Sequence, residues 1–329
     1  MSSVKRFFTR EQELVGSIRS WTQSPFIGDD CAVVEDGMLL TVDTLVEGTH
    51  FLLPAIRWRD LGWKSIAVNL SDIAAMAGRP RSLLVSITVP PHVDKVAFKE
   101  LYEGMIECAK AYNTQIVGGD LTKGNALVIS ITAIGKEHEA GCLLRSGAQP
   151  GDVVVVTGSF GASRAGLWLM LNPDAAESDS YARFPKAMAA HVHPLPRLCE
   201  SWSMIRKTAN RGALMDTSDG LADALTQICR ASDIGMEIDL ENVPIDEETR
   251  AIAQIAGADP LDWALYGGED YELVGCMPES AFHNWLDDNP FKAIGVVTNT
   301  NEIILKSASS GANSQQQLDL SKCFEQIEF

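Results

Sequence analysis

The sequence predicts an α/β protein, with helices layered on strands, in two domains. Its 329 residues suggest about two domains, at roughly 150 residues for each. Strand-like and helical runs alternate along most of the chain, which is typical of layered α/β and α+β domains. A glycine-rich stretch at residues 137–151 interrupts this alternation near the middle. We therefore expect one domain over residues 1–140 and a second over residues 141–329.

The first half predicts helices and strands in alternation. Thr9 and Gln12 have the spacing of a capping box and begin a short helix. A turn at residues 35–37 separates two short strands. The strongest helix covers 60–76 and ends before Gly78. The remaining predictions are a strand over 82–89, a helix over 93–112 and strands over 115–117 and 126–135.

The second half repeats the alternation. We expect strands over 152–157, 212–216, 235–240, 271–277 and 292–297, and helices near 160–172, 196–208 and 218–230. The polar segments 172–181 and 307–317 are expected to be loops. The second domain is therefore also predicted to be α/β.

The charge balance excludes two classes of partner. Asp and Glu number 44 against 27 Lys and Arg, which gives a formal net charge of −17. A chain this acidic is a poor candidate for binding nucleic-acid backbone or an anionic membrane through bulk charge. We therefore expect no nucleic-acid partner and no membrane partner.

The cysteines and the N-terminus indicate a cytoplasmic protein. The 7 cysteines are odd in number, and no pair is spaced C-x-x-C, as expected for reduced thiols rather than a disulfide framework or a zinc site. The first residues lack the apolar segment of a secretory signal. No apolar run approaches the length of a membrane span.

Several common catalytic and nucleotide-binding motifs are absent from the sequence. No two of the 26 glycines are spaced i, i+2, which excludes the G-x-G-x-x-G dinucleotide fingerprint and the glycine loop of protein kinases. There is no Walker-type phosphate loop, no G-x-S-x-G and no H-E-x-x-H. His191 and His193 have no obvious third ligand, so we interpret the pair as a loop detail rather than a metal site.

The positive signal is a set of acidic residues at strand ends and helix starts. Each alone could be an ordinary helix cap or turn residue. Asp43 is harder to explain in this way because it lies inside an apolar strand, and so is Asp72 because it lies in an otherwise apolar helix. The motifs that carry the set are GDD (28–30), VDT (42–44), LSD (70–72), GGD (118–120), DTSDG (216–220) and GGED (267–270).

Such a set points to divalent cations and phosphate. Two carboxylates about 4 Å apart repel by roughly 4 kcal/mol at an effective dielectric of about 20, so several in one cleft would need cations. Mg²⁺ prefers oxygen ligands and often shares its site with substrate phosphates. Glycines beside the acids allow backbone N–H groups to approach phosphate oxygens. We therefore predict Mg²⁺-dependent handling of a polyphosphate.

Seven motifs that occur in one order resemble the bacterial thiamine-monophosphate kinase family. They are GDDCAVV, VDTLVEGTHF, NLSDIAAMAGRP, IVGGDLT, LLRSGAQPGD, MDTSDGLADAL and YGGEDYEL, and they extend over Ile27–Leu273. A weaker match follows at Lys322–Phe324. The family is part of a superfamily with aminoimidazole-ribonucleotide synthetase, selenophosphate synthetase and a hydrogenase-maturation protein.

The resemblance implies a fold and a reaction. The implied fold is like that of aminoimidazole-ribonucleotide synthetase, with an N-terminal domain (1–140) for ATP, Mg²⁺ and dimerisation and a C-terminal α/β domain (141–329). Two N-terminal sheets would pair into a barrel across a homodimer. The implied reaction is direct, in-line transfer of the γ-phosphoryl group from ATP to thiamine phosphate, with several Mg²⁺ ions. The product would be thiamine diphosphate, and the reaction would be the last step of its biosynthesis.

The resemblance also implies roles for individual residues. The metal ligands would be Asp30, Thr41, the backbone carbonyl of Val42, Asp43, Asp72, Asp120, Asp216 and Asp219. The ATP contacts would be Gly119, Asp120, Arg145 and Ser218, and the thiamine-phosphate contacts His50, Glu269 and Phe324. Asp43, Asp72, Asp120 and Asp216 are expected to carry catalysis. The nucleophile is already an anionic phosphate oxygen, so it needs positioning and charge neutralisation rather than a strong base.

Other interpretations stay open at this point. His50 could be a packing histidine at a strand end, and Phe324 an apolar anchor for the C-terminus. Val42 stands where the family has Ser or Thr, so a ligand hydroxyl would be lost but a backbone ligand kept. The chain could also be a different ATP-using member of the superfamily, or a nucleotide-binding regulator without turnover.

Overall fold

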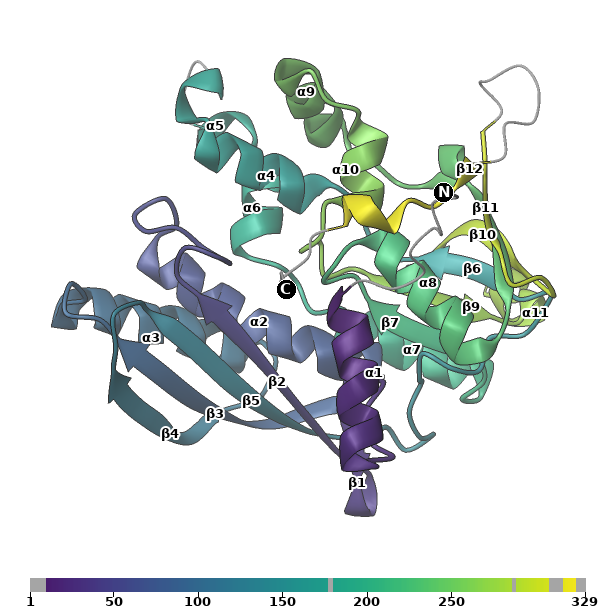
Figure 1. Cartoon of the computed structure of the whole chain (residues 1–329), viewed down its shortest axis with the longest axis horizontal. Coiled ribbons are helices and arrows are strands. Elements are labelled where there is room, and N and C mark those ends of the chain that lie inside the picture. The colour runs from purple at the N-terminus through teal and green to yellow at the C-terminus, as the bar shows by residue number, and fades with distance from the viewer. Residues whose placement is uncertain (1–9, 177–179, 286–287, 308–315, 324–329) are drawn as a thin grey trace.

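Two mixed β-sheets form the frame of the two domains in the computed structural model (Figure 1). The structure describes residues 10–176, 180–285, 288–307 and 316–323. The predicted α/β class is therefore confirmed, with one sheet in each half of the chain.

The N-terminal sheet has five strands, and only β3 and β4 run parallel. In spatial order they are β1 (Ala32–Val34), β2 (Met38–Val46), β5 (Val128–Lys136), β3 (Arg79–Val89) and β4 (Ile116–Lys123). Successive residues alternate between buried and half-buried along β5, because side chains of a strand point to opposite faces in turn. One face of the sheet is therefore core and the other is open.

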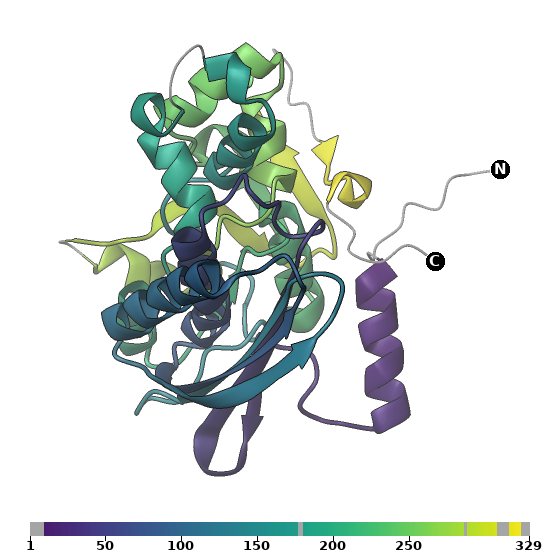
Figure 2. The same cartoon turned by 90° about the vertical axis from the view of Figure 1, so that its left-hand side faces the viewer.

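Two helices, α2 (Trp58–Ala75) and α3 (Lys95–Ala111), cover the core face of this sheet (Figures 1 and 2). They pack closely because each has a glycine against the backbone of the other. A Cβ on Gly104 would lie 1.9 Å from the carbonyl oxygen of Arg59, and one on Gly62 would lie 2.0 Å from that of Leu101. The Asp94 side chain caps the start of α3 by accepting from two backbone N–H groups.

The helix α2 is the central element of the molecule. It contacts β2 and β5 of its own sheet and also β7, α6 and α7 of the second domain. Most residues of α2 are buried for that reason, polar Ser65, Asn69 and Ser71 among them. The apolar character of the predicted helix is thus explained by packing on all sides.

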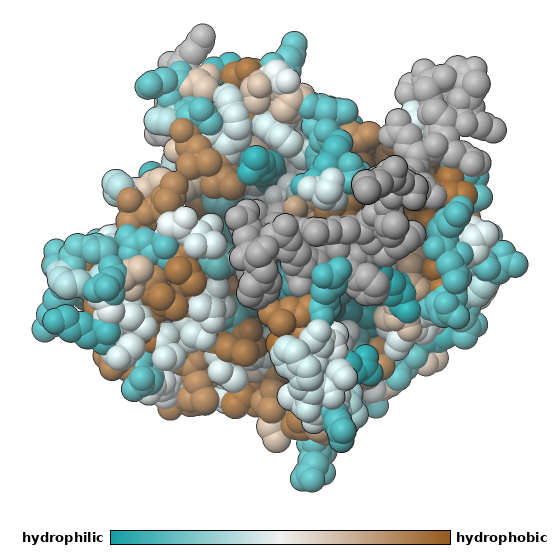
Figure 3. Space-filling view, in the orientation of Figure 1, coloured by the Kyte–Doolittle hydropathy of each residue, from teal (hydrophilic) through white to brown (hydrophobic). Residues whose placement is uncertain are grey.

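The opposite face of the N-terminal sheet is uncovered in the single chain. Val42 is 59% exposed and Leu84 is 40% exposed on this face. The strand β4 forms the edge and is exposed along nearly its whole length. Figure 3 shows apolar side chains on the surface over these strands.

The C-terminal sheet has seven strands, of which only β11 and β8 run parallel. Its spatial order is β12 (Gln316–Gln317), β11 (Ile303–Lys306), β8 (Gly235–Asp239), β10 (Lys292–Thr298), β6 (Val153–Val156), β9 (Leu273–Met277) and β7 (Ala213–Asp216). Buried Val154, Val156 and Ile294 of the sheet pack with Leu225 and Ile228 of α8 (Leu221–Ser232). This core holds the C-terminal domain together.

Further helices surround this sheet. A group at the top of Figure 1 shares a small core of its own, built on Leu169, Met188 and Ile252. Its members are α4 (Ala162–Leu171), α5 (Ser180–Arg183), α6 (Pro185–Val192), α9 (Glu247–Ala256) and α10 (Pro260–Tyr266). Elsewhere lie α7 (Leu198–Thr208), α11 (Glu279–His283) and the short 3-10 turns η1 (Glu35–Gly37), η2 (Pro173–Ala176), η3 (Leu240–Asn242) and η4 (Leu320–Lys322).

The first helix, α1 (Arg10–Thr22), stands beside the body of the molecule (Figure 2). Its Gln12 side chain donates to Asp223 of α8 at 2.5 Å, so α1 contacts the second domain. Among the described residues, no helix is both long enough and apolar enough to cross a membrane.

Most predicted elements are present with shifted ends, but β4 differs in a way that affects the site. The sequence places Gly119 and Asp120 at the end of a strand, whereas β4 continues to Lys123 and both residues lie inside it. Gly119 fits there because it has φ +158° and because a Cβ would meet the Val85 carbonyl oxygen at 1.8 Å. The short helices α5, α6, α9 and α10 were not predicted.

Candidate active site

A deep cleft separates the two domains and has a volume of about 1640 Å³. Its walls come from α1, the loops around residues 27–30 and 48–56, β2, α2, α8 and the loop before β9. Many of the predicted site residues line it, namely Asp30, Thr41, Val42, Asp43, His50, Asp72, Arg145, Ser218, Asp219 and Glu269. Residues from both domains therefore meet at one cavity.

Three acidic residues from distant parts of the chain converge here: Asp30 and Asp72 line the cleft, and buried Asp216 lies beside them without lining it. Each of Asp30, Asp72 and Asp216 offers a carboxylate oxygen, and these oxygens lie within 4.8 Å of one another. Asp30 precedes β1, Asp72 lies near the end of α2 and Asp216 is the last residue of β7. The long α2 carries Asp72 to the strand end of the other domain, and the loop before β1 places Asp30 beside it.

The carboxylates repel one another and are shielded from water. Burial, followed by the nearby charge of Asp30, raises the pKa of Asp216 to about 8, although the Ser71 hydroxyl donates to Asp216 at 2.6 Å. Burial and the charges of Asp43 and Asp216 raise the pKa of Asp72 well above its usual value. Burial, with Asp30, raises the pKa of Asp43 to about 6. The cluster has more negative charge than the protein itself neutralises.

Strand geometry aims Thr41 and Asp43 at the cluster. The Thr41 hydroxyl donates to Asp72, and the backbone N–H of Asp43 donates to the Asn69 side chain at 3.0 Å. Side chains alternate along a strand, so Val42 between them points to the open face. The Val42 side chain therefore does not join the cluster, and only its backbone could bind a metal.

Arg145 is the cation in direct contact with the acids. Its guanidinium donates to both carboxylate oxygens of Asp30, at 2.8 and 3.3 Å. Its remaining nitrogen donates to Gln227 of α8 at 2.5 Å, and its backbone N–H donates to Asp29 at 2.7 Å. Such a held guanidinium is a suitable partner for phosphate oxygens.

Ser218 and Asp219 lie on the loop between β7 and α8. Burial, together with the charges of Asp223 and Glu11, raises the pKa of Asp219 to about 7. The Ser218 carbonyl accepts a hydrogen bond from the backbone N–H of Glu269 at 2.6 Å. This contact joins the loop to the segment that carries the predicted substrate contact.

His50 and Glu269 also line the cleft. The ring nitrogen Nδ1 of His50 accepts from the backbone N–H of Val46 at 3.0 Å, which fixes the ring at the end of β2. Glu269 is paired with Lys64 of α2, with 2.8 Å between Oε1 and Nζ. The third predicted substrate contact, Phe324, lies outside the described residues.

Gly119 and Asp120 are not brought to the cleft in the single chain. The register pairs Asp120 with Ser86, Ser86 with Ser130 and Ser130 with Thr44. Asp120 on β4 is therefore three strand spacings, or roughly 14 Å, from Thr44 on β2. All of this row lies on the open face, whereas Asp43 lies in the adjacent row on the core face. Within one chain, Asp120 therefore cannot reach the acids around Asp72.

Several polar residues of the site escaped the sequence analysis. Asn69 and Ser71 lie on α2 and bond to Asp43 and Asp216, and Gln227 bonds to Arg145. The only available signal was the presence of polar residues in an apolar helix beside Asp72. Lys64, on the same helix, was missed in the same way.

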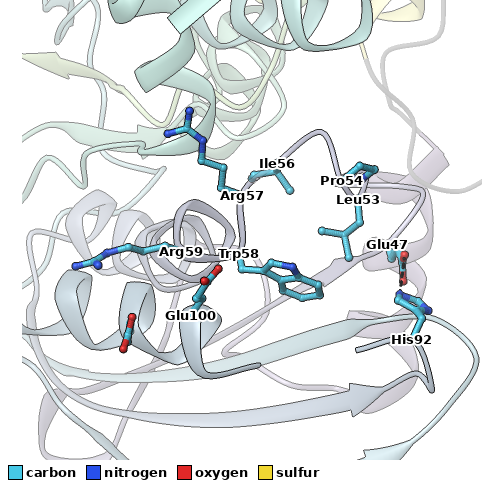
Figure 4. Close-up of a pocket in the computed structure, with 10 residues that line it drawn as sticks. Glu47, Leu53, Pro54, Ile56, Arg57, Trp58, Arg59, His92 and Glu100 are labelled. Carbon is cyan, nitrogen blue, oxygen red and sulfur yellow. Dashed lines mark ion pairs between the residues drawn. The ribbon is translucent and has the colours of Figure 1, made fainter. Parts of the chain in front are cut away.

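The two histidines at 191 and 193 have different surroundings, and a second pocket is separate from the cleft. His191 is not a loop residue as expected: it is buried in α6, lines the cleft and lies 3.0 Å from the Ser163 hydroxyl. His193 follows that helix and lies 2.8 Å from Asp60, so the two rings have different partners. A separate pocket of about 770 Å³ lies between the loop before α2 and the start of α3 (Figure 4). It contains Trp58 and the Glu47–His92 pair and none of the predicted site residues.

Comparison with known proteins gives one consistent result. The N-terminal and C-terminal domain models of the AIR synthase related protein family match residues 28–136 and 149–307. The thiamine-monophosphate kinase of Bacillus subtilis (strain 168) is 40% identical over 261 residues, covering 76% of this chain and 77% of that protein. The thiamine-monophosphate kinase of Aquifex aeolicus (strain VF5) is 36% identical over 279 residues, covering 83% of this chain and 88% of that protein.

Solved structures agree with these relatives. The structure of AaThiL complexed with AMPPCP and TMP has a TM-score of 0.82 and 31% identity, covering 96% of this chain and 98% of that chain. Hydrogenase maturation protein HypE in complex with ATP has a TM-score of 0.68 at 18% identity, which shows a shared fold alone. The chain therefore belongs to the AIR synthase related family and, within it, to the thiamine-monophosphate kinases.

Proposed function

We propose that this chain is a kinase that transfers the γ-phosphoryl group of ATP to thiamine phosphate and releases thiamine diphosphate and ADP. The observation that carries the proposal is the convergence of Asp30, Asp72 and Asp216 at a cleft that also holds Arg145. Relatives at 36–40% identity are thiamine-monophosphate kinases, and a related structure holds AMPPCP and TMP together. ATP is thus the co-substrate in this account.

The acid cluster fits Mg²⁺. All its donors are hard oxygen atoms, and burial raises the pKa of Asp43, Asp72 and Asp216, so a bound cation would stabilise their ionised forms. The residues that would hold the ions are Asp30, Thr41, the Val42 carbonyl, Asp43, Asp72, Asp216 and Asp219, with Asp120. Bound Mg²⁺ would neutralise phosphate charge during transfer.

The protein's own side chains supply position and charge. Arg145 is held by Asp30 and Gln227 and can meet phosphate oxygens in the cleft, next to Ser218 on the β7–α8 loop. His50 and Glu269, the residues predicted to contact thiamine phosphate, line the same cleft. A phosphate oxygen of the acceptor is already anionic, so alignment of the two substrates takes the place of a general base.

We further propose that two copies form a homodimer through their N-terminal sheets. Two features support it: the open apolar face around Val42 and Leu84, and the exposed edge strand β4. Pairing of two such sheets into a barrel would cover that face and place Gly119 and Asp120 inside the assembly. Their proposed roles toward ATP and metal depend on this dimer.

Two related proposals concern organisation and location. The domain division at residues 140/141 is supported by the gap between the two matched family models, which end at 136 and begin at 149. A cytoplasmic location is supported by the free state of all seven cysteines, since thiols stay reduced in that compartment.

A single assay tests the proposed function. Purified chain is incubated with ATP, Mg²⁺ and thiamine phosphate, and thiamine diphosphate is measured by chromatography, with Asp216→Asn as the inactive control. We expect equal amounts of ADP and thiamine diphosphate, and no ADP when thiamine phosphate is omitted. Saturable ATP binding without any thiamine diphosphate would instead identify a nucleotide-binding regulator and overturn the proposal.

A further inference from the structure

Lys64 is a buried charged side chain for which the phosphoryl-transfer mechanism has no use. It lies on α2 at the junction of the two domains, and its side chain is 0% exposed. It is not among the residues that line the cleft. Burial of an ammonium group costs several kcal/mol unless it is paired, so such a residue is kept only where a partner stabilises it.

The partner is Glu269 of the other domain. The Nζ atom of Lys64 lies 2.8 Å from Oε1 of Glu269, and the Glu269 side chain remains 26% exposed, on the wall of the cleft. Burial alone would raise the pKa of Glu269, but the adjacent Lys64 ammonium opposes it, and that pKa lies below its ordinary value. One face of this carboxylate is therefore held by protein and the other faces the cavity.

The backbone around Glu269 is held in an unusual conformation. Glu269 has φ +58° and the preceding Gly268 has φ +68°, both in the left-handed region. A residue other than glycine is strained there, so surrounding contacts must hold it. Two contacts do so: the bond from the Glu269 N–H to Ser218 at 2.6 Å and the ion pair with Lys64.

The other groups that face Glu269 do not replace Lys64. Burial and then Lys64 lower the pKa of His191 to about 3, and its Nδ1 is 3.0 Å from the Ser163 hydroxyl and 3.7 Å from Glu269. His191 is therefore neutral at ordinary pH. Arg164 of α4 lies beside Gly267, and His50 faces Glu269 from the end of β2. Lys64 is the cation in contact with the carboxylate.

We propose that Lys64 is a positioning residue that fixes the Glu269 carboxylate at the cleft wall, and thereby sets the affinity for the cationic ring system of the acceptor. The inference rests on the proposed function, because thiamine phosphate combines a cationic thiazolium ring with an amine-bearing pyrimidine. Either group is attracted by an ionised, correctly aimed carboxylate. Lys64 acts without touching the substrate, from a helix that also carries Asp72.

The test uses Lys64→Met, which keeps the aliphatic stem and removes the charge. We expect KM for thiamine phosphate to rise about tenfold or more, with KM for ATP and kcat changed by less than about threefold. The matched control is Lys99→Met, an exposed lysine of α3 whose side chain is 77% exposed, which should leave both KM values unchanged. An unchanged KM for thiamine phosphate in an active Lys64→Met chain would overturn the inference.

A pH profile separates positioning from a merely structural role. Without Lys64, Glu269 takes up a proton at higher pH, so KM for thiamine phosphate in Lys64→Met should climb as pH falls from about 8 to 6, relative to the wild type. In Glu269→Gln the KM should already be high, and Lys64→Met added to it should cause little further loss. If KM for thiamine phosphate and KM for ATP rise equally and kcat falls by a similar factor, with no pH dependence, Lys64 only supports the fold.

A second variant covers failure of Lys64→Met to fold. Lys64→Gln keeps a hydrogen-bond donor toward Glu269 without the charge, and it should show a smaller rise in KM with the same pH dependence. Wild-type KM and a flat pH profile in Lys64→Gln would contradict the inference. A wild-type chain that makes no thiamine diphosphate would overturn the proposed function instead, so the two failures are distinguishable.

Discussion

At the scale of single residues, the site is explained by carboxylates placed where a chain normally avoids them. Asp43 lies on the core face of a strand and Asp72 on a buried helix, and each has few protein partners: a backbone bond to Asn69 and a bond from Thr41. Such positions are unfavourable in a metal-free protein. They are understandable only as ligands whose charge is balanced when cations and phosphates bind.

Replacement of Asp43 by Asn should separate function from folding. We expect kcat to fall by about 100-fold or more, because a carboxylate ligand of the cations that would neutralise phosphate charge is lost. The melting temperature should not fall, because the variant removes a buried and unbalanced charge. Steady-state assays and thermal denaturation of the same preparation measure both. A variant that melts at a lower temperature, while its activity keeps the wild-type dependence on Mg²⁺ concentration, would show that Asp43 is structural.

The raised pKa values also predict how stability depends on pH. Burial, first among the causes, raises the pKa of Asp43 to about 6, of Asp219 to about 7 and of Asp216 to about 8, against 3.8 for ordinary Asp. The folded chain thus binds protons that the unfolded chain has released. Their contribution to stability is complete below about pH 4 and is lost as pH rises toward 8.

We therefore expect the metal-free chain, kept in EDTA, to melt at a lower temperature at pH 8 than at pH 5. Mg²⁺ should restore most of the difference at pH 8, because the ions bind the ionised carboxylates. In Asp216→Asn the difference between the two pH values should be smaller. A metal-free wild type that is as stable at pH 8 as at pH 5 would contradict the charge repulsion described for the cluster.

At the scale of elements, α2 and its close contact with α3 place the acids. The sequence predicts α2 well because it is long, apolar and bounded by glycine and proline. It predicts β4 poorly, because an exposed edge strand with two glycines has no alternation of apolar residues. The short helices α5, α6, α9 and α10 pack on one another, and such partners cannot be read from a local pattern.

The glycine contact between α2 and α3 gives a prediction about stability. Gly104→Ala would place a Cβ 1.9 Å from the Arg59 carbonyl oxygen, so the helices must separate. We expect a loss of about 1–3 kcal/mol in unfolding free energy, measured by urea denaturation. The matched control is Gly16→Ala on α1, where a Cβ meets nothing within 4 Å, and which should be neutral or slightly stabilising. Equal stability of the two variants would contradict the close packing.

The exposed edge strand gives a second prediction at this scale. In a homodimer built on the N-terminal sheets, the open face is buried, so Leu84→Lys should weaken association and favour monomers. Light scattering after size exclusion measures the mass directly. Activity should fall together with dimer content, because Asp120 reaches a site only in the assembly. A wild-type monomer with full activity would contradict this role of the sheet.

At the scale of the whole molecule, the cleft is formed by the joining of two domains. A core that includes Ala75 at the end of α2 and Ala77 just after it, together with Leu143, Val155 and Leu214, packs the domains against each other. The motifs of the sequence indicate which acids meet, since their order matches a family. They do not indicate the pair Lys64–Glu269, whose members are far apart in the chain and meet only through this packing.

The central claim is that acids from both domains form one cation site that holds the phosphates of ATP and thiamine phosphate. A crystal structure with Mg²⁺, a non-hydrolysable ATP analogue and thiamine phosphate tests it most directly. We predict metal ions bound by Asp30, Asp72 and Asp216, with the γ-phosphate of the analogue on the same ions and facing the substrate phosphate. Nucleotide phosphates bound elsewhere, with no metal at these three carboxylates, would contradict the account.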